Sequence, residues 1–232
     1  LNPDIVLTDR YSSPFTVDLL RQTGFPVVQV PEAMSFDDTI SNVRLVAEAL
    51  GREAAGERVI ARFKARMNAA SREVTEGSPT AIYYQARGTA ATPESQGGQL
   101  LEHAGLRNLV RDAKPGFGNL PVEEVIRLHP DLIAIGAFRE GEASLATAVL
   151  DHPALKTYTQ REDTALIYLS WEAAACGTPF IATLAEELAG ARDRLMGRDG
   201  AAMGLPRRPA EQQNAEHEEH QIKGQHRPLS LG

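Results

Sequence analysis

The sequence predicts an α/β protein with two Rossmann-like lobes, each built on a parallel sheet, joined by one long helix. The main observation is a sequence motif that occurs twice: Pro3-Asp4 and Pro130-Asp131 each lead into a short apolar run. Residues 121–126, before the second copy, suit a helix with proline and carboxylates in its first turn, and Pro130 ends it. An apolar run after a helix is typical of a strand buried in a parallel sheet. One such unit near each end of the body indicates two similar lobes.

The segment between the two copies predicts the connecting helix. No proline occurs from Ser35 to Glu76, and the segment opens with a capping-box-like sequence. Apolar residues recur at helical spacing, namely Ile40, Val43, Val46 and Leu50. Gly51 and Gly56 are the weak points, where a bend or short break is expected. We therefore expect a nearly continuous helix, with two ordinary surface helices as the alternative.

The other elements follow from prolines, glycines and apolar runs. Strands are expected at residues 4–8, 26–30, 80–85, 132–135 and 165–169, with a short apolar piece at 106–110. Helices are expected at residues 14–22, 94–104, 121–128, 144–150 and 179–195. This alternation predicts parallel sheets that are flanked by helices.

The domain boundaries follow from the same pattern. We expect residues 1–34 to be the remainder of the N-terminal lobe, 35–76 the inter-lobe helix and 77–196 the C-terminal α/β lobe. The chain starts at Leu1, at the end of what should be a helix, so the N-terminal lobe is expected to be incomplete. Residues 197–232 are polar and punctuated by proline, which predicts a disordered tail.

Composition narrows the function classes. The 232 residues are 42% hydrophobic and carry a formal net charge of −7. This balance argues against nucleic-acid binding, which favours a basic surface, and no apolar stretch is long enough to span a bilayer. Cys176 is the one cysteine, so an internal disulfide is excluded.

No catalytic motif emerges from the sequence. It contains no GxSxG, P-loop or HExxH pattern. Cys176 precedes a helix start, where the dipole would lower a thiol pKa; a buried or cleft-lining thiol is the alternative. For His217 and His220 in the tail, the alternatives are a weak metal site and a solvated polar surface. We predict neither catalytic residues nor a metal site.

Candidate ligand-binding residues follow the strands. In open α/β sheets, ligands bind beyond the carboxyl ends of the strands. Aromatic and cationic residues are expected at this edge: Arg10, Tyr11, Tyr84, Arg87, Phe117, Phe138, Arg139 and Trp171. Aromatic rings bury large apolar areas, and guanidinium groups bind carboxylate, phosphate or catecholate oxygens in pairs. The set predicts a site for a large, flat or anionic solute.

Several sequence segments, in their order along the chain, resemble those of a known protein family. They lie at residues 1–6, 19–28, 40–51, 100–109 and 121–133, and are followed by Trp171 and by Cys176-Gly177-Thr178-Pro179-Phe180. This order resembles the ABC-transporter solute-binding proteins for iron–siderophore complexes, haem and cobalamin, whose lobes are joined by one long helix. The resemblance covers the chain from Leu1 to about Leu195.

The resemblance implies a monomeric transport protein rather than an enzyme, in the periplasm or lipid-anchored to the cell envelope. It implies that the solute is carried in the cleft between lobes, with little closure, to a permease in the inner membrane. Glu123 matches the family's glutamate that meets arginines of the permease. Independently of the family, Glu123 and Glu124 also suit the positive end of a helix dipole.

The ligand stays open among three chemical classes. Arg10, Arg87 and Arg139 favour an anionic iron–siderophore complex. Tyr11 and Tyr84 keep haem as an alternative, because a tyrosinate can bind haem iron, and cobalamin is the third class. A different function class, a metallocofactor-handling α/β enzyme, requires several Cys or His residues near strand ends. An interaction module without a ligand cleft is a further alternative.

Overall fold

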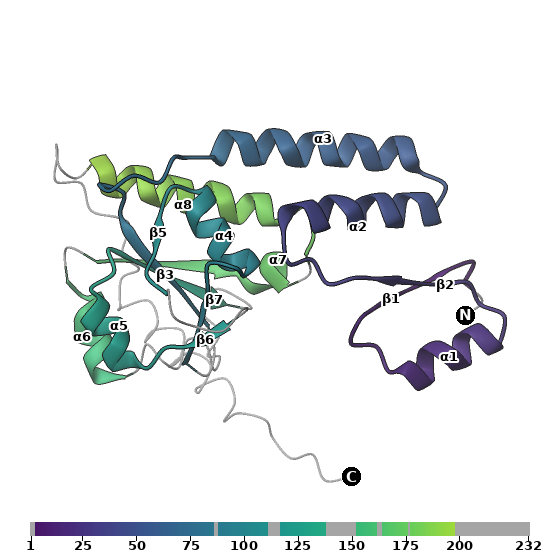
Figure 1. Cartoon of the computed structure of the whole chain (residues 1–232), viewed down its shortest axis with the longest axis horizontal. Coiled ribbons are helices and arrows are strands. Elements are labelled where there is room, and N and C mark those ends of the chain that lie inside the picture. Colours follow the sequence, from purple (N-terminus) through teal and green to yellow (C-terminus); the bar gives the residue numbers. More distant parts are fainter. Residues whose placement is uncertain are drawn as a thin grey trace, which may run out of the picture.

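The computed structural model describes residues 3–85, 88–110, 117–137, 152–161, 164–175 and 177–197. The strands are β1 (Val6–Asp9), β2 (Val27–Val30), β3 (Thr80–Gln85), β4 (Thr89–Ala91), β5 (Arg107–Asn108), β6 (Phe117–Asn119), β7 (Leu132–Ala137) and β8 (Ala165–Ser170). The helices are α1 (Pro14–Gln22), α2 (Phe36–Ala49), α3 (Glu53–Ala70), α4 (Gln96–His103), α5 (Val122–Leu128), α6 (Pro153–Thr159), α7 (Trp171–Ala175) and α8 (Ile181–Met196). These elements form an α/β fold with two separate sheets (Figure 1).

The smaller sheet is the β1–α1–β2 unit. Its two strands are parallel, with Val6 opposite Val27 and Asp9 opposite Val30. Helix α1 begins with Pro14, whose fixed backbone angle suits the first helical position. The predicted strand, helix and strand are confirmed here to within two residues at each boundary.

The larger sheet has the strand order β6-β4-β3-β7-β8, and β5 also pairs with β3. Strands β3, β5, β7 and β8 are parallel, as predicted. The sheet is mixed, however, because β4 pairs antiparallel with both β3 and β6. Neither β4 nor β6 was predicted, since Thr89–Ala91 and Phe117–Asn119 are too short to show an alternating apolar pattern.

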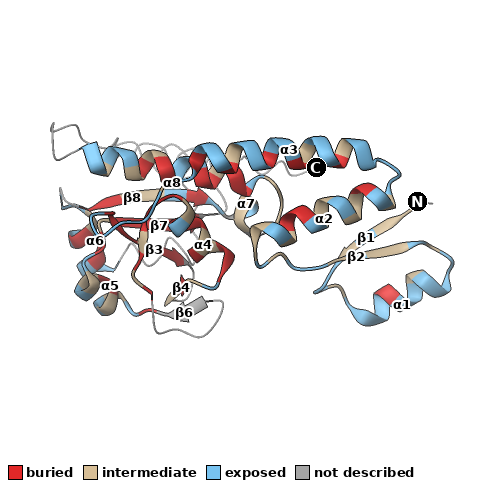
Figure 2. Cartoon of the chain, turned by 45° about the horizontal axis from the view of Figure 1, so that its top comes forward, coloured by how far each residue is buried: buried red, intermediate tan, exposed pale blue. Residues whose placement is uncertain are grey.

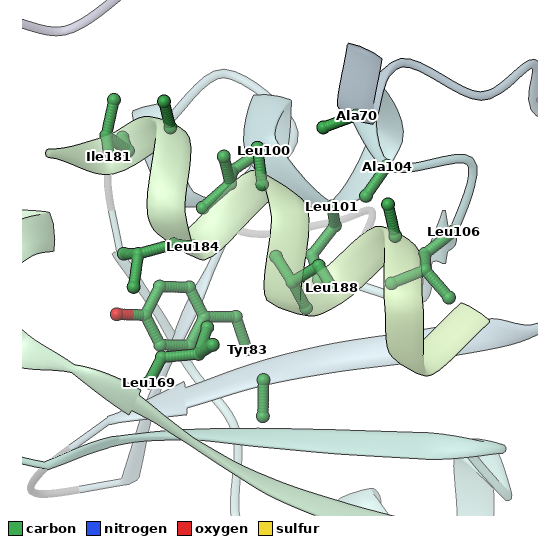
Figure 3. Packing of buried hydrophobic residues seen from close by; sticks show 14 of the residues in the cluster. Ala70, Tyr83, Leu100, Leu101, Ala104, Leu106, Leu169, Ile181, Leu184 and Leu188 are labelled. Carbon is green, nitrogen blue, oxygen red and sulfur yellow. The ribbon is translucent and has the colours of Figure 1, made fainter. Parts of the chain in front are cut away.

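The core lies on both faces of the larger sheet. One face packs against α3, α4 and α8 and the other against α5 and α6. Neighbouring side chains of β3 point to opposite faces, so Tyr83 joins the first cluster and Tyr84 the second. Buried residues concentrate here, whereas the β1–α1–β2 unit is mostly intermediate or exposed (Figure 2). Figure 3 shows Tyr83 packed between the sheet and leucines such as Leu184 and Leu188.

The prediction of a nearly continuous inter-lobe helix is wrong. The chain reverses at Leu50–Arg52, and α2 and α3 pack antiparallel beside each other (Figure 1). Gly51 takes φ 60°, a left-handed conformation that ends a helix. The alternative of two helices is confirmed, and α3 alone continues toward the larger sheet, where it packs along α8. Residues 71–76 are not helical.

Two short helices were not expected from the sequence. Helix α6 was not predicted, because the seven residues after His152 are too few to show a clear period. Helix α7 directly continues β8 and was also not predicted. The expected helix at 144–150 and the tail from residue 198 lie outside the described residues. None of the helices in the described part of the chain is long and apolar enough to cross a membrane.

Candidate functional site

The carboxyl ends of strands from both sheets lead to one region of the molecule. Strand β2 ends at Val30 and β8 at Ser170, and both run toward the surroundings of α7 (Figure 1). The segments that follow them touch, because a Cβ atom on Gly177 would lie 2.5 Å from the Cβ atom of Ala33. Gly177 has φ 54°, so a glycine is favoured here by both its conformation and this contact.

The loop after β1 is shaped by Asp9. Its Oδ1 atom accepts hydrogen bonds from the backbone N–H of Tyr11 and from the hydroxyl of Ser12, both at 2.9 Å. Such aspartate turns fix the chain where a strand ends. The side chains of Arg10 and Tyr11 are therefore presented at the surface, and Tyr11 is 74% exposed.

Glu32 joins these two predicted residues. Its Oε2 atom lies 3.5 Å from Nη1 of Arg10. It also raises the pKa of Tyr11, chiefly through a side-chain hydrogen bond, while Arg10 acts in the opposite direction. Glu32 was not predicted, although it follows β2 as Arg10 follows β1, so the same strand-end rule applied to β2 finds it.

Tyr84 lies in the core of the larger sheet and not at the exposed strand-end edge. Its side chain is 2% exposed and lies in the core cluster with α5 and α6. Its hydroxyl donates a 2.9 Å hydrogen bond to the carbonyl of Leu120. Burial, with a smaller contribution from Glu123, raises the pKa of Tyr84. The sequence did not indicate this burial, which arises because β3 is covered on both faces and a tyrosine near its end packs inward.

Two further candidates are placed by their backbones. Trp171 begins α7 immediately after β8, at the carboxyl edge of the larger sheet as predicted. The Ser170 hydroxyl accepts a 3.3 Å hydrogen bond from the N–H of Ala173, which caps this short helix. Phe117 begins β6 and pairs with Ala91 of β4, so it belongs to the antiparallel part of the sheet.

The remaining candidates lie outside the described residues: Arg87, Phe138, Arg139, Cys176, His217 and His220. Of the predicted set, the structure thus brings Arg10 and Tyr11 together and takes Tyr84 away from the surface. In the described ranges, no group of three or more His, Cys, Asp or Glu side chains is placed to hold a metal ion.

Two hollows lie among the described residues, and neither is lined by a predicted ligand residue. The larger is about 330 Å³ and lies between α2, α3, Val30 and the segment Gly177–Pro179, with mainly apolar walls. The smaller is about 280 Å³ and lies over β8 and α8, beside Tyr168, Glu187 and Arg194. Both are at the small end of the size range of ligand pockets.

Glu123 and Glu124 share the first turn of α5 but differ in their surroundings. Glu124 forms a bidentate hydrogen-bonded pair with Arg127, one turn later on the same helix. That arginine lowers the pKa of Glu124. Glu123 is exposed, and the resolved parts of the chain provide no hydrogen-bond or ion-pair partner for it.

Comparison with known families gives the decisive observation. A family model described as "Periplasmic binding protein" matches residues 1–169. The chain belongs to this periplasmic binding protein family. It is therefore a non-enzymatic, substrate-binding component of an ABC transporter, which sets aside the metallocofactor-handling enzyme. No curated protein matches the chain.

Solved periplasmic binding proteins have a similar fold. The heme-binding protein RhuT from Roseiflexus sp. RS-1, in apo form, has a TM-score of 0.68 at 21% identity, covering 84% of this chain and 77% of its own. An ABC-type Fe3+-hydroxamate transport protein from Saccharomonospora viridis DSM 43017 has a TM-score of 0.61 at 22% identity, covering 86% and 69%. The vitamin B12 binding protein BtuF of Vibrio cholerae has a TM-score of 0.54 at 13% identity, covering 84% and 75%.

In this periplasmic binding protein, two connections join the sheets. The first is the segment from β2 to α2, which is held on α4 by hydrogen bonds from Gln99 to the carbonyl of Met34 and from Gln96 to that of Ser35. The second is α3, which Arg66 ties to α8 through a bidentate pair with Glu186. Both connections are attached to the larger sheet's helices.

Proposed function

We propose that the protein captures an iron–siderophore-type complex between two lobes and delivers it to an ABC permease. The observation that carries this proposal is the family match over residues 1–169. The geometry supports it, because the ends of β2 and β8 lead to a common region from opposite sides. The two sheets would then be the cores of the two lobes.

The solute class is inferred from chemistry and from relatives. Structurally similar proteins are described as binding heme, Fe3+-hydroxamate and vitamin B12. Within this range we favour an iron chelate, because Arg10, Arg87 and Arg139 suit the oxygen atoms of such a complex, with haem or cobalamin as the alternatives. We propose that Trp171, Phe138 and these arginines contact the solute.

Small closure is expected on solute binding. Connections made of a packed helix and of a segment fixed by hydrogen bonds resist bending more than free loops do. The attachment of α3 to α8 and of residues 34–39 to α4 supports this expectation. The protein would act as a preformed monomeric carrier in the periplasm or on a lipid anchor.

The test is the absorption spectrum of the protein in the form in which its host produces and exports it, purified without added ligand. A catecholate or hydroxamate charge-transfer band identifies an iron–siderophore complex, a Soret band identifies haem, and a corrin spectrum identifies cobalamin. A colourless preparation that binds none of these solutes on titration would contradict the proposed function.

A further inference from the structure

The edge where β1 and β2 end carries more negative than positive charge. Asp9 and Glu32 supply two carboxylates there, and Arg10 supplies one guanidinium. Asp9 is occupied in shaping the loop, because its Oδ1 atom accepts two hydrogen bonds from Tyr11 and Ser12. Glu32 is the carboxylate that remains for Arg10.

Glu32 contacts Arg10, one of the two side chains that the sequence assigns to solute binding on this edge. Its Oε2 atom is 3.5 Å from Nη1 of Arg10, and its carboxylate is close enough to Tyr11 to raise the pKa of that phenol. Arg10 and Glu32 have side chains that are 70% and 37% exposed, so the pair faces the solvent from which a solute would arrive.

We propose that Glu32 is a specificity-determining residue, which pairs with Arg10 in the solute-free protein and disfavours solutes with anionic groups at this edge. The inference rests on the proposed solute-binding function and adds the class of solute. An anionic chelate has to displace Glu32 from Arg10 and then lie beside its charge. A neutral chelate with amide or hydroxyl groups meets no such competition.

The size of the effect follows from exposure. Exposed ion pairs are weak and solvent screens them, so Glu32 tunes affinity and does not block the site. Replacing Glu32 by glutamine removes both the competing anion and its repulsion of a bound anion. We expect roughly three- to tenfold tighter binding of anionic solutes and no change for neutral ones.

The experiment compares probes that differ in charge within one ligand class. One pair is ferric protoporphyrin IX and its neutral dimethyl ester; the other is an anionic ferric tris-catecholate and a neutral ferric tris-hydroxamate. Each is titrated against the parent protein and the Glu32→Gln, Arg10→Gln and double variants. The matched control is Glu57→Gln, which removes the same charge from an exposed pair with Arg44 on the α2–α3 hairpin.

The proposal expects tighter binding of the anionic member alone in Glu32→Gln, with a smaller gain when Arg10 is also replaced and none in Glu57→Gln. Equal affinity of Glu32→Gln and the parent for the anionic probe would overturn it, as would weaker binding of every probe, which would make Glu32 a direct solute contact. If neither the parent nor any variant bound any of these probes, and none bound cobalamin either, the proposed function itself would be overturned.

Discussion

Gln96 donates a hydrogen bond from Nε2 to the hydroxyl oxygen of Thr39, 3.3 Å away and 57 residues earlier in the chain. Both side chains are buried, with Thr39 fully inaccessible. The same Nε2 atom lies 3.3 Å from the carbonyl oxygen of Ser35, the residue that caps α2. This contact joins the start of α2 to α4, and so joins the smaller sheet's connection to the larger sheet.

Replacement of Gln96 by alanine should loosen that junction. A buried hydrogen-bonding group that loses its partner costs about 1–3 kcal/mol, so the free energy of unfolding should fall by that amount, and amide exchange should quicken at residues 35–39. Denaturant unfolding and hydrogen exchange measure the two effects. Gln99→Ala is the comparison, because Gln99 is only half-buried and its two hydrogen bonds, at 3.2–3.3 Å, go to main-chain carbonyls. Equal losses in both variants would show that burial of Gln96 is unimportant.

The α2–α3 hairpin depends on a close approach at Gly56. A Cβ atom added to Gly56 would lie 2.5 Å from the Cβ atom of Ala47. The Gly56→Ala variant gains up to about 1 kcal/mol in helix propensity but should lose about 1–3 kcal/mol from overpacking. Gly77→Ala is the control, since nothing lies within 4 Å of its added Cβ. Thermal unfolding should show a lower Tm for Gly56→Ala alone; a raised Tm would show that the helices separate without cost.

The segment that was expected to be one long helix shows why the sequence predicts helices but not how they are arranged. The apolar spacing of residues 36–49 and 53–70 identifies helical segments whether they are continuous or folded back. Only the conformation of Gly51 and the packing of Gly56 on Ala47 distinguish the two. Strand β3 was predicted to the residue because its apolar run is bounded by Pro79 and by small residues.

The candidate site was predictable to a smaller extent. The strand-end rule places Arg10, Tyr11 and Trp171 at strand ends, and the structure agrees. It cannot tell an outward from an inward side chain on a sheet covered on both faces, so it did not predict that Tyr84 is buried. Glu32 is neither aromatic nor cationic, so it was not among the candidates. Its pairing with Arg10 depends on the register of β1 with β2.

Trp171 and Tyr84 should respond differently to truncation. Trp171→Ala removes a large ring that follows β8, and we expect solute affinity to fall by about 1–3 kcal/mol; Arg87→Ala should behave alike through a lost charged hydrogen bond. Tyr84→Phe should leave affinity unchanged and lower the free energy of unfolding by about 1 kcal/mol, since it loses one buried hydrogen bond. Ligand titration and denaturant unfolding distinguish these outcomes. Parent-like binding by Trp171→Ala and Arg87→Ala would remove them from the site.

Glu186 should contribute to the acid sensitivity of the fold. Its hydrogen-bonded pair with Arg66 lowers the pKa of Glu186. A lowered folded-state pKa stabilises the protein above the unfolded value, about 4.3 for glutamate, and this stabilisation is lost as pH falls through the folded-state pKa. Because the side chains are 36% and 42% exposed, the contribution should be at most about 1 kcal/mol.

The measurement is the free energy of unfolding from pH 7 to pH 3. Glu186→Gln should be less stable at pH 7 and should converge with the parent at pH 3. The charge-swapped double variant, Arg66→Glu with Glu186→Arg, should recover part of the stability at pH 7. A constant difference between Glu186→Gln and the parent at all pH values would mean that the ionised pair contributes nothing.

Glu123 and Glu124 offer a paired test of permease docking. Glu124 is occupied by Arg127 within α5, whereas Glu123 is exposed in the first helical turn and held in place by that short helix. Charges at an interface set orientation and association rate more than they affect a distant solute site. Glu123→Arg should therefore leave solute affinity intact and impair uptake through the cognate permease. Glu124→Arg should lose the intrahelical pair and place two arginines one turn apart, each effect costing about 0.2–0.5 kcal/mol, and should support normal uptake.

Uptake assays with the complete transporter and solute titrations of the isolated protein together decide the role of Glu123. If both glutamates only complement the helix dipole, the two variants should show equal, small losses of stability and no difference in transport. Docking through Glu123 predicts a transport defect in Glu123→Arg alone, and this defect should become smaller as salt screens the charges at the interface. Normal uptake by Glu123→Arg, or a loss of its solute binding, would assign the carboxylate to the helix or to the solute site instead.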